Sequence, residues 1–149
     1  MTSPARRSVR EDTSWVLAPL LDLPHVVHAA VISGDGLIEG ASPGLEREAA
    51  EGVAAMMSAL QGAARTTTVA FSGDFGVKLR QTVIESDQGW VFAIPAGENT
   101  CLAVFAEPEV NMGVVTHHMQ VQVATLGAKT MNAPPRDDAP DRSPHDAPA

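Results

Sequence analysis

The sequence predicts one α+β domain with the element order α-β-β-α-β-β-β-α. The chain has 149 residues, of which 44% are hydrophobic, and this is enough for one domain with a modest core. Residues 26–33 and 100–106 are apolar on both faces, as central strands are. An alanine- and methionine-rich stretch with helical spacing lies between them, which predicts a long amphipathic helix.

The charge of the chain is acidic, with a formal net charge of −8. Residues 13–132 hold 5 basic and 12 acidic residues, so −7 belongs to the expected domain. This balance argues against nucleic-acid binding, which needs clustered Lys and Arg. A single cysteine excludes a disulfide framework and a cysteine-rich zinc site. With neither a signal sequence nor a membrane-length apolar run, we expect a cytoplasmic protein without direct membrane insertion.

The two ends of the chain differ in composition from the middle. Residues 133–149 contain five prolines and no large apolar side chain, so they cannot bury enough surface to offset chain entropy. We therefore expect residues 1–12 and 133–149 to be disordered and residues 13–132 to form the domain.

The first three elements are a short helix and a hairpin. The helix is expected over Ser14–Leu23, because Pro24 ends it. A strand over Val26–Ser33 is followed by a Gly-Asp-Gly turn at 34–36 and a short strand over Leu37–Ala41.

The central helix is expected over residues 43–65. Ser42 is a suitable N-cap and Pro43 suits the first helical position. The helix carries two adjacent apolar stripes, the first of Ala49, Val53, Met56, Leu60 and Ala63, and the second of Ala50, Ala54, Met57 and Ala64. Both stripes belong to a buried core helix in one interpretation. In the other, one stripe covers the sheet and the second meets a partner helix.

The remaining pattern predicts three strands and a final helix. The side chains of residues 77–85 alternate between the two faces, as in a half-exposed strand. This strand and the strand at residues 37–41 should form the edges of the sheet. In chain order we expect a loop or ragged strand at 66–76 and strands at 77–85, 90–95 and 100–106. The last helix should run from Glu109 or Asn111 to Met131.

Three segments carry a resemblance to a known family. They are HVVHAAVISGDGLIEGAS, LEREAAEGVAAMMSALQGAAR and RQTVIESDQGWVFAIPAGENTCLAVFAEPEVNMGVVTHHM. Over residues 13–131 the chain resembles the roadblock/LC7 domain, and in particular bacterial roadblock proteins encoded beside a sensor kinase and a Ras-like GTPase. It departs from the family in its shorter first helix, which contains Pro19.

The resemblance implies a profilin-like fold and a homodimer. The five-stranded antiparallel sheet would carry the long helix on one face and the terminal helices on the other. The strand at 77–85 would pair with its twin, and the helices at 43–65 would pack side by side. The implied interface contains Ala50, Ala54, Met57, Gln61, Lys78, Arg80 and Thr82. Alternatively, Lys78 and Arg80 only guard an exposed edge against aggregation.

The function that the resemblance implies is regulation without catalysis. The chain would be a homodimeric regulator or adaptor of a Ras-like small GTPase in a bacterial signalling complex that includes a sensor histidine kinase. The alternative is a PAS- or profilin-like sensor of a small molecule. Such a sensor needs a roomy cavity, against which the alanine-rich helix and the few aromatic residues argue.

The sequence contains little that predicts chemistry of its own. Neither a P-loop nor a Rossmann glycine motif occurs, so we expect no cofactor, no metal ion and no catalytic residue. Arg65, Lys78 and Arg80 are candidates to reach a bound GTPase's phosphates, as an arginine finger does.

The other polar candidates have ordinary structural interpretations. His117 and His118 are adjacent on a helix and therefore point about 100° apart. We expect Cys101 to be a buried, inert thiol. The remaining candidates are interpreted as common surface, core or turn residues, namely His25, His28, Asp35, Glu85 and Asp87.

Overall fold

The computed structural model describes residue 13 and residues 15–131 of the chain, so the expectations for residues 1–12 and 133–149 lie outside the described part. After an N-terminal helix over residues 15–21, the elements are β1 (Val26–Ser33), β2 (Ile38–Ala41), α2 (Arg47–Ser72), β3 (Thr82–Ser86), β4 (Gly89–Pro95), β5 (Thr100–Ala106) and α3 (Met112–Met131). In the described part, no helix is long and apolar enough to cross a membrane.

The five strands form one antiparallel sheet in the order β2-β1-β5-β4-β3. The predicted element order is confirmed, as are the two central strands and the two edges. β1 and β5 are central because their apolar side chains on both faces need cover from both sides. The turn between β1 and β2 closes at Gly36, whose φ of 82° is accessible to glycine at little cost.

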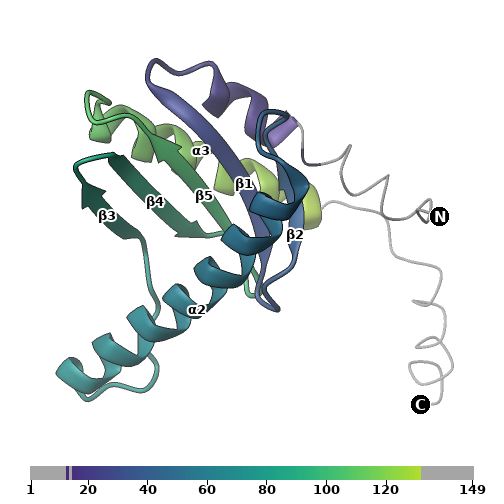
Figure 1. Ribbon diagram of the computed structural model, residues 1–149. Coiled ribbons are helices and arrows are strands. Elements are labelled where there is room, and N and C mark those ends of the chain that lie inside the picture. The colour runs from purple at the N-terminus through teal and green to yellow at the C-terminus, as the bar shows by residue number, and fades with distance from the viewer. Residues whose placement is uncertain (1–12, 14, 132–149) are drawn as a thin grey trace, which may run out of the picture.

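The helices cover the two faces of the sheet as expected (Figure 1). On one face the N-terminal helix and α3 enclose the larger core, in which Leu20 and Met119 pack with Phe92, Leu102 and Val104. On the other face α2 contributes Ala54 and Met57 to a smaller core.

The start of α2 differs from the prediction. Ser42 is not its N-cap, because the Ser42 hydroxyl accepts the Ala29 backbone N–H (3.3 Å) and contacts Nδ1 of His28 (3.1 Å). A turn closed by the Leu45 N–H on the Ser42 carbonyl follows (3.0 Å). The helix then begins at Arg47, without a side-chain cap at Glu46.

The end of α2 also differs, since the helix continues to Ser72 through the predicted loop. Thr66, Thr67 and Thr68 have low helix propensity. However, the Thr67 and Thr68 hydroxyls donate to the carbonyls one turn earlier, at 2.7 and 2.9 Å. Gly73 ends the helix in the left-handed conformation, and its N–H donates to the Val69 carbonyl (2.8 Å).

The strand predicted over residues 77–85 is shorter than expected, since β3 spans only Thr82–Ser86. Thr82 pairs with Ala93, so continuing the register would place Arg80 opposite Pro95. Proline has no N–H to donate to a ladder. Residues 77–81 therefore form an irregular segment that leads from α2 into β3.

The larger core should carry most of the stability. Phe92 is 1% exposed and is the largest fully buried side chain in the described part. Phe92→Ala should lower the free energy of unfolding by about 3–5 kcal/mol, measured by urea denaturation. Leu37→Ala is the control, because Leu37 is 63% exposed and should lose less than about 0.5 kcal/mol. Equal losses would contradict this description of the core.

Candidate interaction surface

The strand register arranges the side chains that face α2 in three parallel rows. The middle row is made of alanines from four neighbouring strands, Ala41, Ala30, Ala103 and Ala93. Ala54 and Met57 of α2 pack on this row. Because both sides of the contact are small, the helix lies close to the sheet and covers mainly this row.

An apolar groove lies along one flank of α2, over the second row of side chains. That row runs across four strands as His28, Phe105, Val91 and Ile84. The groove has a volume of about 450 Å³ and is walled by side chains of α2 and the turn before it, namely Leu45, Ala49, Val53 and Met56. Met56 is 73% exposed, and Ile84 at the sheet edge is 39% exposed.

The C-terminal part of α2 extends beyond the sheet (Figure 1). The overhang is residues 66–72 of α2, which follow the last helix residue that lines a cleft on the sheet (Arg65), and most of its side chains are exposed. Phe71 in the overhang is 90% exposed, and Phe75, just after it, is 83% exposed. Large apolar side chains gathered on a surface mark an interaction site.

The sheet has an open edge at β3 on the side of the groove. In the described part of the chain β3 pairs with β4 alone. A free strand edge presents unpaired N–H and C=O groups to another chain. The uncovered apolar row reaches this edge at Ile84, so the groove and the free edge form one continuous surface.

A polar cleft lies on the opposite flank of α2, over the third row, which consists of Ile32, Cys101 and Pro95. Its volume is about 720 Å³, and α2 lines it with Ser58, Gln61, Gly62 and Arg65. The expectation that the alanine-rich helix leaves no roomy cavity was therefore wrong. Of the helix residues on this flank, Ser58 and Gly62 are small and leave part of the space open.

The orientation of α2 is the reverse of the expected one, in which the second stripe meets a partner helix. Ala50, Ala54 and Met57 of the second stripe are 3%, 0% and 7% exposed in the single chain. The first stripe faces outward through Ala49, Val53 and Met56. Ala54 therefore has no surface left for a second chain, because the alanine row of its own sheet covers it.

The other predicted interface residues lie around the helix and the free edge. The Thr82 hydroxyl, at the start of β3, donates to Oε1 of Gln61 within the same chain (2.8 Å). Lys78 and Arg80 are exposed in the irregular segment before β3, not in the strand.

The sequence predicts a loop or ragged strand over residues 66–76, which contain Phe71 and Phe75. In the structure Phe71 lies in the last turn of α2, whereas Phe75 follows the helix. Met56 was placed in the first stripe without a partner. Two adjacent apolar stripes do not reveal which one covers the sheet, and this choice depends on the alanine row beneath α2.

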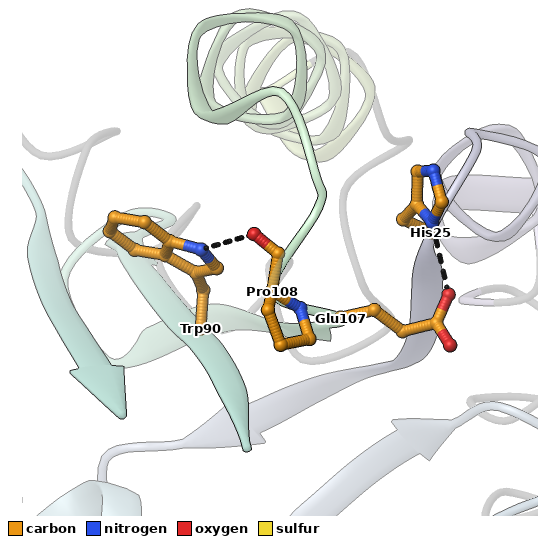
Figure 2. A network of polar contacts seen from close by, with 4 residues as sticks. All are labelled: His25, Trp90, Glu107 and Pro108. Atoms are coloured by element: carbon orange, nitrogen blue, oxygen red, sulfur yellow. Dashed lines mark hydrogen bonds and ion pairs between the residues drawn. The ribbon is translucent and has the colours of Figure 1, made fainter. Parts of the chain in front are cut away.

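One further polar cluster joins the start of β1 to the end of β5 (Figure 2). Nδ1 of His25 lies 3.1 Å from Oε1 of Glu107, and the Trp90 indole N–H donates to the Pro108 carbonyl (3.3 Å). His25, Glu107 and Glu109 each offer one atom of a kind that can bind a metal ion, and these atoms lie within 4.8 Å of one another. All three residues are exposed. The contacts connect the sheet to the segment before α3.

The remaining candidates stay separate from any such cluster. Nδ1 of His118 lies 2.8 Å from the Val114 carbonyl oxygen, and the rings of His117 and His118 meet edge to face. Asp35, Glu85 and Asp87 are exposed.

Cys101 is buried, as predicted, at 9% exposure in the floor of the polar cleft. Burial raises the pKa of its thiol from 9.0 to about 11, and a hydrogen bond with the Ile94 backbone opposes this shift. The thiol is therefore neutral at neutral pH, the unreactive form of cysteine.

Comparison with known proteins identifies related sequences and folds. The sequence profile of the Roadblock/LC7 domain matches residues 14–106. The crystal structure of a Roadblock/LC7 domain from Streptomyces avermitilis is 32% identical, with a TM-score of 0.73, over 79% of this chain and 97% of that one.

More distant structures share the fold. Myxococcus xanthus MglB is 12% identical, with a TM-score of 0.72, over 93% of this chain and 98% of its own. Acanthamoeba castellanii profilin II is 15% identical, with a TM-score of 0.54, over 78% of this chain and 99% of its own. No curated protein sequence matches significantly. The structural likeness confirms the predicted profilin-like fold.

The buried thiol predicts a loss of stability at alkaline pH. Well below pH 9.0 the thiol is neutral in both the folded and the unfolded chain, so its contribution is fully present. Between pH 9.0 and about 11 the unfolded chain ionises first, and the free energy of unfolding should fall by roughly 2–3 kcal/mol. Urea denaturation across this range measures the loss.

Cys101→Ala is the matched control, and it should lose less stability over the same pH range. The chain contains no tyrosine, so no phenol titrates there. Identical pH profiles for the two proteins would contradict the burial of an un-ionised thiol.

Proposed function

Because the chain belongs to the Roadblock/LC7 domain family, we propose that it is a non-catalytic homodimeric regulator or adaptor of a Ras-like small GTPase. We place it in the cytoplasm, in a bacterial signalling complex that includes a sensor histidine kinase. Any recruitment to the membrane would then occur through its partners.

Two features carry the dimer, namely the apolar groove along the first part of α2 and the overhang at the C-terminal end of the same helix. The overhang, with Phe71 at its end, has no sheet of its own chain beneath it. The groove has an apolar floor that its own α2 does not cover. In a two-fold symmetric dimer a contact between the overhang of one chain and the groove of its twin occurs twice. The overhang of each chain would therefore cover the groove of the other.

The free edge at β3 supports the same arrangement. Pairing of two β3 strands would satisfy both edges and bring the two Ile84 side chains close to the shared boundary. In the alternative, Lys78 and Arg80 protect the edge against aggregation. This alternative is less favoured because both residues precede β3. Within β3 the only charged side chain is that of Glu85.

Self-association of this fold has a precedent at low sequence identity. An MglB structure with a tetrameric arrangement, 16% identical with a TM-score of 0.69, matches 86% of this chain and 91% of its own. This relative supports the proposed assembly without specifying which surfaces this chain uses.

The GTPase partner follows from the family and fits the surface charge. The net charge of −7 over residues 13–132 favours a partner with a basic patch, chiefly through the association rate. A regulator of this kind can order the switch loops of the GTPase by surface complementarity alone. Arg65 in α2, and Lys78 and Arg80 in the segment before β3, are the candidates to reach the phosphates of such a partner.

A charge introduced into the groove should weaken the dimer without unfolding the chain. Met56→Asp should raise the dimer dissociation constant at least about tenfold, because it buries a charge in the apolar contact. Ala59→Asp is the control, since Ala59 is also exposed on α2 but does not line the groove. Sedimentation equilibrium measures both. The dimer is contradicted if neither variant changes the mass.

Charge placed beneath α2 should act on the fold instead. Ala54 is completely buried on the alanine row. Ala54→Asp should therefore cost about 3 kcal/mol or more of unfolding free energy, as an uncompensated buried charge. Circular dichroism with urea denaturation measures this loss. A variant that keeps its fold and loses only self-association would restore the original assignment of the second stripe to the interface.

The regulatory claim is tested on a Ras-like GTPase from the same genome. Adding the chain should change GTP hydrolysis or nucleotide exchange by about tenfold or more, and Met56→Asp should reduce the effect if the dimer is the active form. Radiolabelled GTP hydrolysis and fluorescent nucleotide release measure the two rates. Absence of both binding and a rate change would remove the GTPase from the proposal.

A further inference from the structure

The polar cleft on the second flank of α2 gathers cationic side chains in an acidic domain. Residues 13–132 contain only five basic residues, and Arg65 and Lys78 both line this cleft. Within the described part of the chain, Arg47 pairs with Glu51 (Nε–Oε2 3.3 Å), whereas neither Arg65 nor Lys78 forms an ion pair. Arg65 and Lys78 therefore bring two positive charges to the cleft, against one negative charge from Glu98 among its lining residues.

The walls of the cleft are fixed by hydrogen bonds between separate elements. The Ser58 hydroxyl on α2 donates to the Gly34 carbonyl (2.9 Å), and the Gly34 N–H donates to the Asn99 carbonyl (2.6 Å). Gln61 accepts the Thr82 hydroxyl through Oε1, which leaves its amide nitrogen as a donor. Glu98 is the one acidic residue that lines the cleft.

The floor of the cleft is apolar and neutral. Ile32, Pro95 and Leu79 line it together with Cys101, whose thiol is un-ionised at neutral pH. A volume of about 720 Å³ is in the range of sites for small organic molecules. Such a site combines room for an uncharged body with two cations at its rim.

We propose that this cleft binds a small organic phosphate, with its phosphoryl group toward Arg65 and Lys78 and its body on the apolar floor. A phosphate monoester carries a charge of about −1.5 to −2 at pH 7, which two cations match. Charge-assisted hydrogen bonds to Arg and Lys are the strong contacts in such sites. The acidic surface elsewhere repels anions, so the cleft is where an anion would concentrate.

Binding in the cleft would connect two elements that lead to the proposed dimer surface. Arg65 belongs to α2, just before the overhang, and Lys78 belongs to the irregular segment before β3. A ligand held by both side chains would fix the helix relative to the free edge. Because Arg65 and Lys78 are also candidates to reach the phosphates of a bound GTPase, ligand binding is tested on this chain alone, with no GTPase present.

The test is an NMR titration of the ¹⁵N-labelled full chain with three probes. Phenyl phosphate carries both the anion and an apolar body, inorganic phosphate carries the anion alone, and benzyl alcohol carries the body alone. We expect phenyl phosphate to produce saturable shifts at the amides of Gly34, Gly62 and Gly97. Inorganic phosphate should bind more weakly at the same place, and benzyl alcohol should produce no saturable shifts there.

Matched variants locate the site. Arg65→Gln and Lys78→Gln should each raise the dissociation constant of phenyl phosphate at least about fivefold, whereas Arg47→Gln should change it less than about twofold. Gly62→Leu adds a bulky side chain to the cleft lining, at a position where an added Cβ meets no atom within 4 Å, and should abolish binding. Gly52→Leu, equally unobstructed but on the groove flank, should leave binding unchanged.

Three outcomes would overturn the proposal. The first is that phenyl phosphate produces no saturable shifts at the three glycines. The second is that Arg47→Gln weakens binding as much as Arg65→Gln, which indicates general charge attraction only. The third is that Gly62→Leu, with a native circular dichroism spectrum, binds phenyl phosphate as tightly as the unmodified chain.

Discussion

The close packing of α2 on a row of alanines is the constraint on which the rest of the structure depends. Ala30, Ala93 and Ala103 present so little side chain that the helix lies close to the sheet through Ala54. A helix held close to one row covers that row and leaves its neighbours open. The same contact therefore buries part of the core and determines which surfaces remain available to partners.

The two open flanks of α2 differ in chemistry because the sheet rows beneath them differ. On one flank Phe105 and Val91 form the floor of an apolar groove that continues to the free edge of the sheet. On the other flank Arg65 and Lys78, which form no ion pair within the described part of the chain, line a cleft with an apolar floor. The helix thus separates a surface suited to another chain from a cleft suited to a small anion, and its overhang extends past both.

Much of the fold could be predicted from the sequence because its strongest patterns are local. The doubly apolar stretches of β1 and β5 and the glycine turn after β1 give clear strand signals, and the structure places these elements at the predicted residues. The limits of α2 could not be predicted in the same way. Ser42 binds β1 instead of capping the helix, and the threonines at 66–68 are helical through hydroxyl bonds to the preceding turn.

The candidate site was harder to predict because it depends on register across strands. Which stripe of α2 is buried depends on the alignment of alanines from four strands, and no local pattern reports it.

The most direct test of the account is the mass of the unmodified chain in solution by light scattering. Two 15.6 kDa chains per particle are expected at low micromolar concentration, whereas a stable monomer there would contradict the proposed dimer.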